Sequence, residues 1–123
     1  MEDIRMNPPN FISTLKTISE KNSENIAFSI NGNSFTYAEF YQKVNAIAQE
    51  LLIDNKQQLK IIVATNNDIE TYASIIAIWL TGNIYIPLNL EGNNNKRTTI
   101  IRSIKPDLLL TSKPTEQNTL TKY

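Results

Sequence analysis

Two acidic side chains follow an apolar run whose composition is typical of a buried strand. Asp68 and Glu70 come soon after Lys60–Thr65 (KIIVAT), with only a few polar residues between. In open α/β sheets, ligands bind beyond the carboxyl ends of the strands, so a carboxylate at this place could contact a substrate. Both residues also suit the start of a helix, where side-chain oxygens accept hydrogen bonds from the backbone. Asn67 with Glu70, or Asp68 alone, can cap the next helix, which explains both carboxylates without a ligand.

Three aromatic side chains are the next candidates for contact with a ligand. Tyr72, Trp79 and Tyr85 could stack on a planar ligand, because aromatic rings form favourable stacked and edge-to-face pairs. They also fit the apolar periodicity of the helix and the strand that contain them, which favours packing in the core. Glu2 and Asp3 form a charge pair near the N-terminus, and we assign it no role.

A third group, Thr111-Ser112-Lys113, has the side chains that phosphate-binding loops use. Such loops also need glycines, because only then can backbone N–H groups approach the phosphate oxygens. No glycine follows Gly92 in the sequence. We therefore exclude a phosphate loop at these residues.

The composition removes several classes of catalytic and metal sites. The 123 residues contain no His, no Cys and only three Gly, and 41% of them are hydrophobic, enough to bury the core of one domain. Disulfides, zinc sites built from Cys or His, and Ser-His-Asp or Cys-His catalytic groups are all impossible. We expect no catalytic, cofactor-binding or metal-binding residue in this chain.

The charge distribution bears on partners and location. Twelve Lys and Arg balance twelve Asp and Glu, and the longest basic cluster is Lys96-Arg97. Proteins that bind nucleic acid usually carry a basic excess, so we expect no nucleic-acid partner. The longest apolar run, Ala73–Leu80, is too short to span a membrane, and residues 1–10 do not resemble a signal peptide. We expect a cytoplasmic protein without a membrane partner, whose zero net charge gives little protection against self-association.

The first third of the chain predicts a helix, a hairpin and a second helix. An apolar stripe at helical spacing runs through Asn10–Lys21, after two prolines. Ile26–Ile30 and Asn33–Phe35 are strand-like and flank Asn31-Gly32, the dipeptide that best suits a type I′ hairpin turn. Thr36 and Glu39 form a capping box for a helix that reaches about Leu52. Its core-facing stripe consists of Phe40, Val44, Ile47, Ala48 and Leu51.

The remainder alternates strands and helices. The expected elements are strand Lys60–Thr65, helix 69–81 ended by Gly82, strand Ile84–Leu88, loop 89–95, helix Lys96–Lys105 and strand Asp107–Ser112. Pro87 marks the end of its strand or an edge of the sheet, because it lacks a backbone N–H. This order predicts an α/β three-layer sandwich, with a mostly parallel sheet, helices on both faces and an N-terminal β-hairpin. Residues 10–112 form the domain, residues 1–9 are a tail, and residues 113–123 are a linker or tail.

Three segments, in this order, resemble the N-terminal portion of adenylate-forming (AMP-binding) ligases. Asn25–Leu52 is similar to the hairpin, the Thr-Tyr-x-Glu motif and the amphipathic helix that open those enzymes. Leu80–Asn89 (LTGNIYIPLN) resembles the motif Leu-Lys-Ala-Gly-x-Ala-Tyr-Val-Pro-Leu-Asp. Lys96–Ser112 resembles the following stretch, which ends in Lys-Pro-x-Leu-Leu-Leu-Thr-Ser. Within the family, the residue pattern of the first segment most resembles that of amino-acid adenylation domains and D-alanine–carrier-protein ligases.

The chain departs from the family pattern around one loop. Asn89 stands where the family has Asp, and Leu90 and Asn93 stand where it has proline. Lys96 replaces a usual Arg at the beginning of the helix. These differences put the conformation of the loop in doubt, more than the fold.

The resemblance implies a two-step reaction for a complete ligase. Such enzymes condense a carboxylate with ATP, in the presence of Mg²⁺, to an acyl-adenylate, and then pass the acyl group to a thiol on coenzyme A or a carrier protein. In this family the glycine-rich phosphate loop, the acyl pocket and the C-terminal catalytic Lys all follow the Leu-Leu-Leu-Thr-Ser strand. No catalytic residue of the family can therefore be carried over to this sequence, and the partner that the resemblance implies is the remaining C-terminal part of a ligase.

Two functional hypotheses of different classes follow. In the first, the chain is the N-terminal subdomain of a ligase that activates a carboxylate. The substrate expected from the resemblance is an amino acid, and the 123 residues alone are expected to be inactive. In the second, it is a stand-alone, non-catalytic binding or interaction module of the same fold, which exposes apolar surface and self-associates. A flavodoxin-like domain is a weaker third alternative, because Thr65–Asp68 contains no glycine for a ligand loop.

Overall fold

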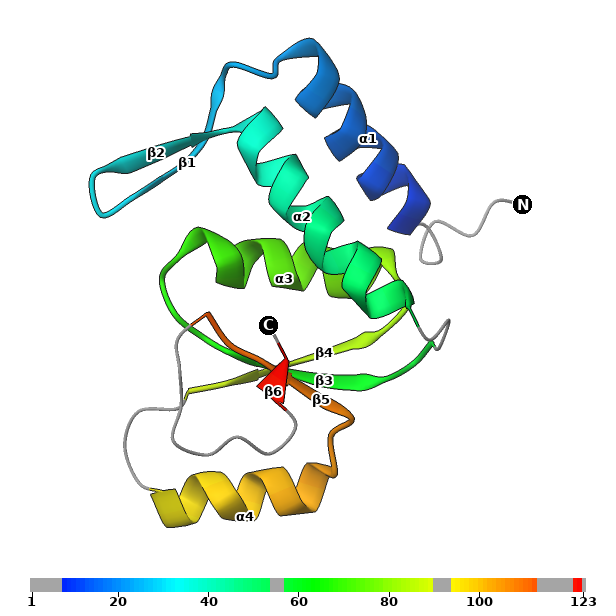
Figure 1. The fold of residues 1–123 in the computed structure, drawn as a ribbon, viewed down its shortest axis with the longest axis vertical. Helices are drawn as coiled ribbons and strands as arrows, with labels where there is room; N and C mark the ends of the chain where they lie inside the picture. The colour runs from blue at the N-terminus through cyan, green and yellow to red at the C-terminus, as the bar shows by residue number, and fades with distance from the viewer. Residues whose placement is uncertain (1–7, 54–56, 90–93, 113–120, 123) are drawn as a thin grey trace.

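The computed structural model describes residues 8–53, 57–89, 94–112 and 121–122. Helices and strands alternate along most of this part of the chain (Figure 1). The elements are α1 (Pro8–Lys21), β1 (Ile26–Ile30), β2 (Asn33–Thr36), α2 (Tyr37–Leu52), β3 (Lys60–Ala64), α3 (Ile69–Leu80), β4 (Ile84–Leu88), α4 (Asn94–Ile104), β5 (Leu108–Leu110) and β6 (Thr121–Lys122).

The main sheet is parallel and has β3 near its centre. The strand order is β4-β3-β5-β6, and β1 and β2 form a separate antiparallel hairpin. Ile61 pairs with Tyr85 of β4 on one side and with Leu108 of β5 on the other. Ile61, Ile62 and Val63 are at most 1% exposed, which confirms the strand buried on both faces that their continuous apolar run predicts.

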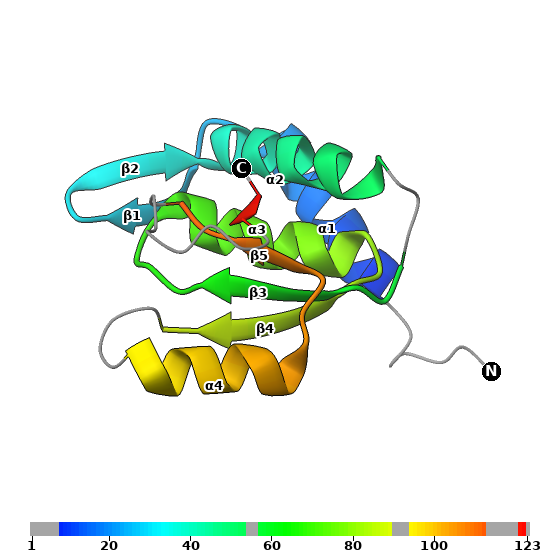
Figure 2. The same cartoon turned by 60° about the horizontal axis from the view of Figure 1, so that its bottom comes forward.

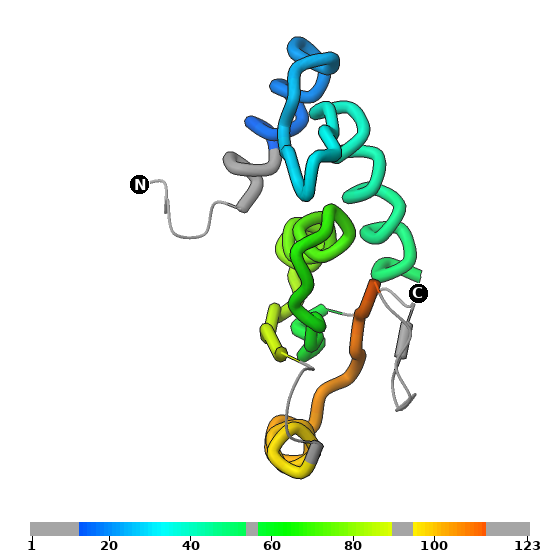
Figure 3. Tube along the Cα trace, turned by 90° about the vertical axis from the view of Figure 1, so that its left-hand side faces the viewer, coloured from blue at the N-terminus to red at the C-terminus, as the bar shows by residue number. Residues whose placement is uncertain are grey.

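Helices cover both faces of this sheet, which confirms the predicted three-layer α/β sandwich (Figures 2 and 3). Successive side chains of a strand point to opposite faces, so β3 contributes to two cores. Ile61 and Val63 pack in a cluster with buried residues of α2 and α3, such as Val44 and Ile78. Ile62 packs on the other face, in a smaller cluster that is completed by α4. The α4 side chains in this cluster are Ile100, Ile101 and Ile104, as their spacing predicts.

The hairpin forms as the Asn-Gly dipeptide predicts. Asn31 and Gly32 have φ values of 50° and 83°, and a type I′ turn needs positive φ at both positions. Ile30 is buried, and Phe28 of β1 lies 4.8 Å from Phe40 of α2, measured between ring centroids. The hairpin therefore packs through its apolar side chains on the helices, outside the main sheet.

The capping box at the beginning of α2 is present with both of its hydrogen bonds. The Glu39 N–H donates to the Thr36 hydroxyl oxygen at 3.1 Å, and the Thr36 N–H donates to the Glu39 carboxylate at 2.8 Å. Each bond satisfies a backbone donor that the first helical turn would otherwise leave without a partner.

Replacing Thr36 with alanine should lower the free energy of unfolding by about 1 kcal/mol, because the first turn loses its side-chain acceptor. Chemical denaturation measures this change. Thr36→Ser is the matched control, since it keeps the hydroxyl. Its decrease in the free energy of unfolding should be at most about half of that in Thr36→Ala. Equal losses in the two variants would show that the hydroxyl has no capping effect.

The end of α3 also follows its sequence signal. Gly82 has φ of 75°, the left-handed conformation expected directly after a helix. Pro87 lies in β4, which occupies one edge of the main sheet among the described residues. The prediction that Pro87 marks a strand end or a sheet edge is therefore confirmed.

Several boundaries differ from the sequence predictions. Helix α1 begins at Pro8 and not at Asn10, because proline fits the first turn of a helix, where its missing N–H is not needed. Helix α4 begins at Asn94, two residues before Lys96. Strand β5 is shorter than Asp107–Ser112, since the Asp107 carboxylate accepts from the Lys60 N–H and Ser112 bonds elsewhere.

The C-terminal segment contains a strand that the sequence analysis did not predict. Residues 113–123 were expected to be a linker or tail, yet Thr121 and Lys122 form β6, which pairs in parallel with Leu109 and Leu110. Two residues offer too short a pattern for a strand to be predicted from sequence. Glu2, Asp3, Leu90, Gly92, Asn93 and Lys113 lie outside the described residues. Among the helices that the structure describes, none is both long and apolar enough to cross a bilayer.

Candidate functional site

The candidate site lies where β3 and β5 end. Because the two strands are parallel and adjacent, Asn66 and Asp68 after β3 come close to Ser112 after β5. The Ser112 hydroxyl donates to the Asp68 carboxylate, and the Asn66 side-chain amide donates to the Ser112 hydroxyl oxygen at 3.3 Å. Three polar side chains from two separate segments of the sequence thus form one cluster at the carboxyl end of the sheet, the edge where open α/β sheets bind ligands.

Asp68 has a clear structural role in this cluster. It is the N-cap of α3, and one carboxylate oxygen accepts from the Thr71 N–H at 2.9 Å and from the Thr71 hydroxyl at 2.6 Å. The other oxygen accepts from Ser112. Of the two caps that the sequence allows, the structure has Asp68 alone. Both carboxylate oxygens of Asp68 therefore bind protein groups, and capping is the role that its geometry supports.

Glu70 is occupied in a different way. Its carboxylate forms a salt bridge with the Lys43 ammonium of α2, at 3.2 Å between Nζ and Oε2. The side chains are 38% and 42% exposed, so water screens the pair and its contribution to stability is below about 1 kcal/mol. The pair joins α2 to α3 beside the cluster.

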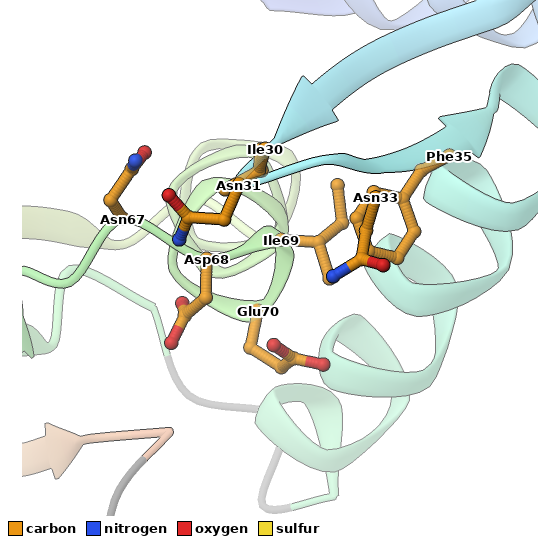
Figure 4. A pocket seen from close by; sticks show the side chains of 8 residues that line it. All are labelled: Ile30, Asn31, Asn33, Phe35, Asn67, Asp68, Ile69 and Glu70. Carbon is orange, nitrogen blue, oxygen red and sulfur yellow. The ribbon is translucent and has the colours of Figure 1, made fainter.

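A shallow pocket opens beside the beginning of α3 (Figure 4). Its volume is about 240 Å³, and it separates the turn of the β1–β2 hairpin from the residues that follow β3. Amide side chains and carboxylates line it together with apolar groups. The lining residues are Ile30, Asn31, Asn33, Phe35, Asn67, Asp68, Ile69 and Glu70.

The three aromatic candidates divide between two places. Tyr72 stacks on Phe28 with centroids 5.3 Å apart and planes 4° from parallel, and its hydroxyl donates to Asn67 at 2.7 Å. Trp79 and Tyr85 meet edge to face at 6.4 Å. Burial raises the pKa of the Tyr85 hydroxyl above its ordinary value, because the charged phenolate would lose solvation. Tyr72 and Tyr85 are partly buried, as the helix and strand periodicity indicates, whereas Trp79 is 47% exposed, so the prediction that it packs in the core is wrong. None of the three rings lines the pocket.

The sequence analysis missed the bond between Asp68 and Ser112. It placed Ser112 at the end of an expected strand and considered its side chain only for a phosphate loop, and it considered Asp68 only within its own segment. The signal that could have found the contact was the topology, since polar residues directly after two neighbouring parallel strands must meet at one edge. Among the described residues, no group of three or more His, Cys, Asp or Glu side chains could hold a metal ion.

Comparisons with known proteins identify the family. A profile of AMP-binding enzymes matches residues 15–122. Equisetin synthetase of Fusarium heterosporum is 24% identical over 111 residues, which are 89% of this chain and 3% of that protein. The D-alanine–D-alanyl carrier protein ligase of Lactococcus lactis is 27% identical over 95 residues, or 77% of this chain and 19% of the ligase. The chain thus spans only a small part of the length of these relatives.

Solved structures agree in fold. An NRPS protein containing adenylation and PCP domains superposes with a TM-score of 0.75 at 18% identity, covering 89% of this chain and 20% of that one. O-succinylbenzoate coenzyme A synthetase (MenE) from Bacillus subtilis gives 0.73 at 19% identity, covering 88% of this chain and 30% of the synthetase. These matches confirm the resemblance drawn from the three sequence segments, and the profile covers most of the chain. The chain belongs to the AMP-binding enzyme family.

Proposed function

We propose that residues 1–123 are the N-terminal scaffold of a cytoplasmic adenylate-forming ligase. The ligase activates a carboxylate with ATP as an acyl-adenylate, releases pyrophosphate and transfers the acyl group to a thiol. The profile match over residues 15–122 carries this proposal, and the shared fold supports it. In such a ligase these residues build the sheet, and the rest of the enzyme supplies the reactive groups.

The relatives favour an amino acid as the substrate and a carrier protein as the acceptor. Those at 24–28% identity include D-alanine–D-alanyl carrier protein ligases and hybrid PKS-NRPS synthetases. One structural neighbour joins an adenylation domain to a PCP domain, whereas MenE is a coenzyme A synthetase. We therefore assign the carrier-protein thiol as the acceptor and coenzyme A as the alternative.

The described residues do not fit a site for ATP and Mg²⁺. Gly32 and Gly82 have positive φ in a hairpin turn and at a helix end, so neither belongs to a loop that surrounds a phosphate. Asp68 uses both carboxylate oxygens for Thr71 and Ser112, and Glu70 pairs with Lys43. We therefore assign the contacts with ATP and Mg²⁺ to the part of the ligase that these 123 residues do not include.

The exchange of radiolabelled pyrophosphate into ATP tests this function, because it follows formation of the adenylate. The purified 123-residue chain should show no exchange with any of a panel of amino acids and aryl acids. The full product of the gene that encodes these residues should exchange with one acid of the panel, and EDTA should abolish that exchange. Exchange by the 123-residue chain would contradict the scaffold role, and a full product that binds no acid and exchanges with none would contradict the ligase.

A stand-alone interaction module is the second candidate, favoured by the exposure of several large apolar side chains. Ile26, Leu52, Ile53, Trp79 and Ile84 are between 43% and 69% exposed. Surfaces of this kind often mark contacts with another protein. Reading the gene beyond the codon for Tyr123 separates the two candidates, since the scaffold requires a continuation, or an adjacent reading frame, with a glycine-rich loop.

A further inference from the structure

The turn of the β1–β2 hairpin is exposed and consists of Asn31 and Gly32, the only Asn-Gly pair in the sequence. The hairpin register pairs Ile30 with Asn33, so the two turn residues lie beyond the last pair of the ladder. A Cβ atom placed on Gly32 would meet no other atom within 4 Å. The backbone between Asn31 and Gly32 is therefore open to solvent and free of neighbouring side chains on the glycine side.

An asparagine that precedes a glycine can react with its own backbone. The backbone nitrogen of the glycine attacks the side-chain carbonyl carbon of the asparagine, and the new C–N bond closes a five-membered succinimide ring. The proton of the backbone N–H passes to a base in the solvent, and the side-chain nitrogen leaves as ammonia. A side chain on the second residue would hinder this attack and restrict the backbone, and glycine has none. Gly32 therefore provides the least hindered nucleophile that a following residue can offer.

We propose that Asn31 is a site of spontaneous deamidation. After the succinimide has formed, one water molecule opens the ring at either of its two carbonyl carbons. Opening at the side-chain carbonyl gives aspartate at position 31. Opening at the backbone carbonyl gives isoaspartate, in which the main chain continues through the former side chain. Each route replaces the neutral amide with a carboxylate and releases ammonia, so the modification needs only water as a co-reactant.

The modification changes the charge of the pocket beside α3. Asn31 lines this pocket together with Asp68 and Glu70, and its side chain points from the turn toward the segment after β3 (Figure 4). The Lys43 ammonium pairs with Glu70, and the Ser112 hydroxyl donates to Asp68. Deamidation adds a carboxylate to a lining that already has two, and it makes the formally neutral chain acidic. The potential in the pocket therefore becomes more negative.

The two products affect the hairpin differently. The pair Asp-Gly suits the same type I′ turn as Asn-Gly, so aspartate leaves the hairpin in place. Buried Ile30 and the contact between the Phe28 and Phe40 rings, 4.8 Å apart, continue to hold β1 against the helices. Isoaspartate lengthens the backbone of the turn by one carbon, which disturbs the pairing of Ile30 with Asn33.

Ageing of the folded protein at mildly alkaline pH tests the site. Peptide mass spectrometry measures the conversion of each asparagine over time and distinguishes aspartate from isoaspartate. Asn31 should convert about tenfold faster or more than Asn33, which is exposed on the same hairpin but precedes Ser34, whose side chain hinders the attack. An Asn31 that keeps its amide, or that converts no faster than Asn33, would overturn the proposal.

Anion-exchange chromatography of the aged protein tests the change in charge. An acidic form should grow with time and elute with the variant Asn31→Asp, which carries the charge of the product and keeps the turn. Asn31→Gln is the matched control, because its side chain would have to close a less favourable six-membered ring, and its acidic form should grow about tenfold more slowly. Circular dichroism confirms that each protein is folded. Equal growth of the acidic form in the two proteins would contradict deamidation at Asn31.

Discussion

Replacing Ile61 with alanine should lower the free energy of unfolding by about 2–5 kcal/mol, the usual cost of removing a buried aliphatic side chain. Ile61 has no exposed surface and lies in the central strand, between Tyr85 and Leu108 of the neighbouring strands. Its side chain packs in the cluster that joins the sheet to α2 and α3. Strands on both sides and helices above limit collapse into the space left behind, so the variant retains a cavity.

Two further variants make this expectation specific. Ile61→Val should cost about 0.5–1.5 kcal/mol, and it remains measurable if the alanine variant does not fold. Ile84→Ala is the control for β4, since Ile84 is 43% exposed, and it should cost less than about 1 kcal/mol. Urea titrations followed by the fluorescence of the single tryptophan, Trp79, give all three values. Similar losses for Ile61→Ala and Ile84→Ala would contradict the buried central position of β3.

The elements were predictable because their signals are local. The alternation of strands and helices, the Asn31-Gly32 turn and the Thr36–Glu39 capping box each depend on residues within one short segment. The continuous apolar run of β3 also indicated burial on both faces. That run could not say which helix each residue meets, since Ile61 and Ile62 are chemically alike and differ only in the face to which they point.

The candidate site was less predictable because its contacts join distant segments. Asp68 and Ser112 are 44 positions apart, and their bond requires β3 and β5 to be neighbours in the sheet. The preference of Asp for helix caps could be predicted from the sequence. The hydrogen bond that the Asp68 carboxylate accepts from the Ser112 hydroxyl could not. Strand β6 also depends on tertiary pairing, since it gains its backbone partners only where β5 already lies.

A buried asparagine that the sequence analysis did not single out should have the second large effect. Asn83 is 8% exposed, and its side-chain oxygen accepts from the Leu59 N–H at 2.9 Å. Its amide donates to the Thr81 hydroxyl oxygen at 2.9 Å, and that hydroxyl lies 2.8 Å from the Ala77 carbonyl, to which it donates. Asn83 thereby joins the end of α3 to the segment that enters β3.

Replacing Asn83 with alanine should lower the free energy of unfolding by about 1–3 kcal/mol, because the Leu59 N–H loses its partner in a partly buried place. Thr81→Val is the matched comparison. It removes the hydroxyl that Asn83 binds but leaves the acceptor for Leu59, so it should cost less than Asn83→Ala. Chemical denaturation measures both losses.

Hydrogen exchange separates this local bond from a general loss of packing. The Leu59 amide should exchange faster in Asn83→Ala than in Thr81→Val when the two are compared at equal global stability, because only the first variant removes its acceptor. The neighbouring bond from the Ile84 N–H to the Leu59 carbonyl, 2.8 Å long, fixes where β4 begins beside β3. Loss of the asparagine should therefore also speed exchange at Ile84. Unchanged exchange at both amides would mean that backbone pairing alone holds this end of the sheet.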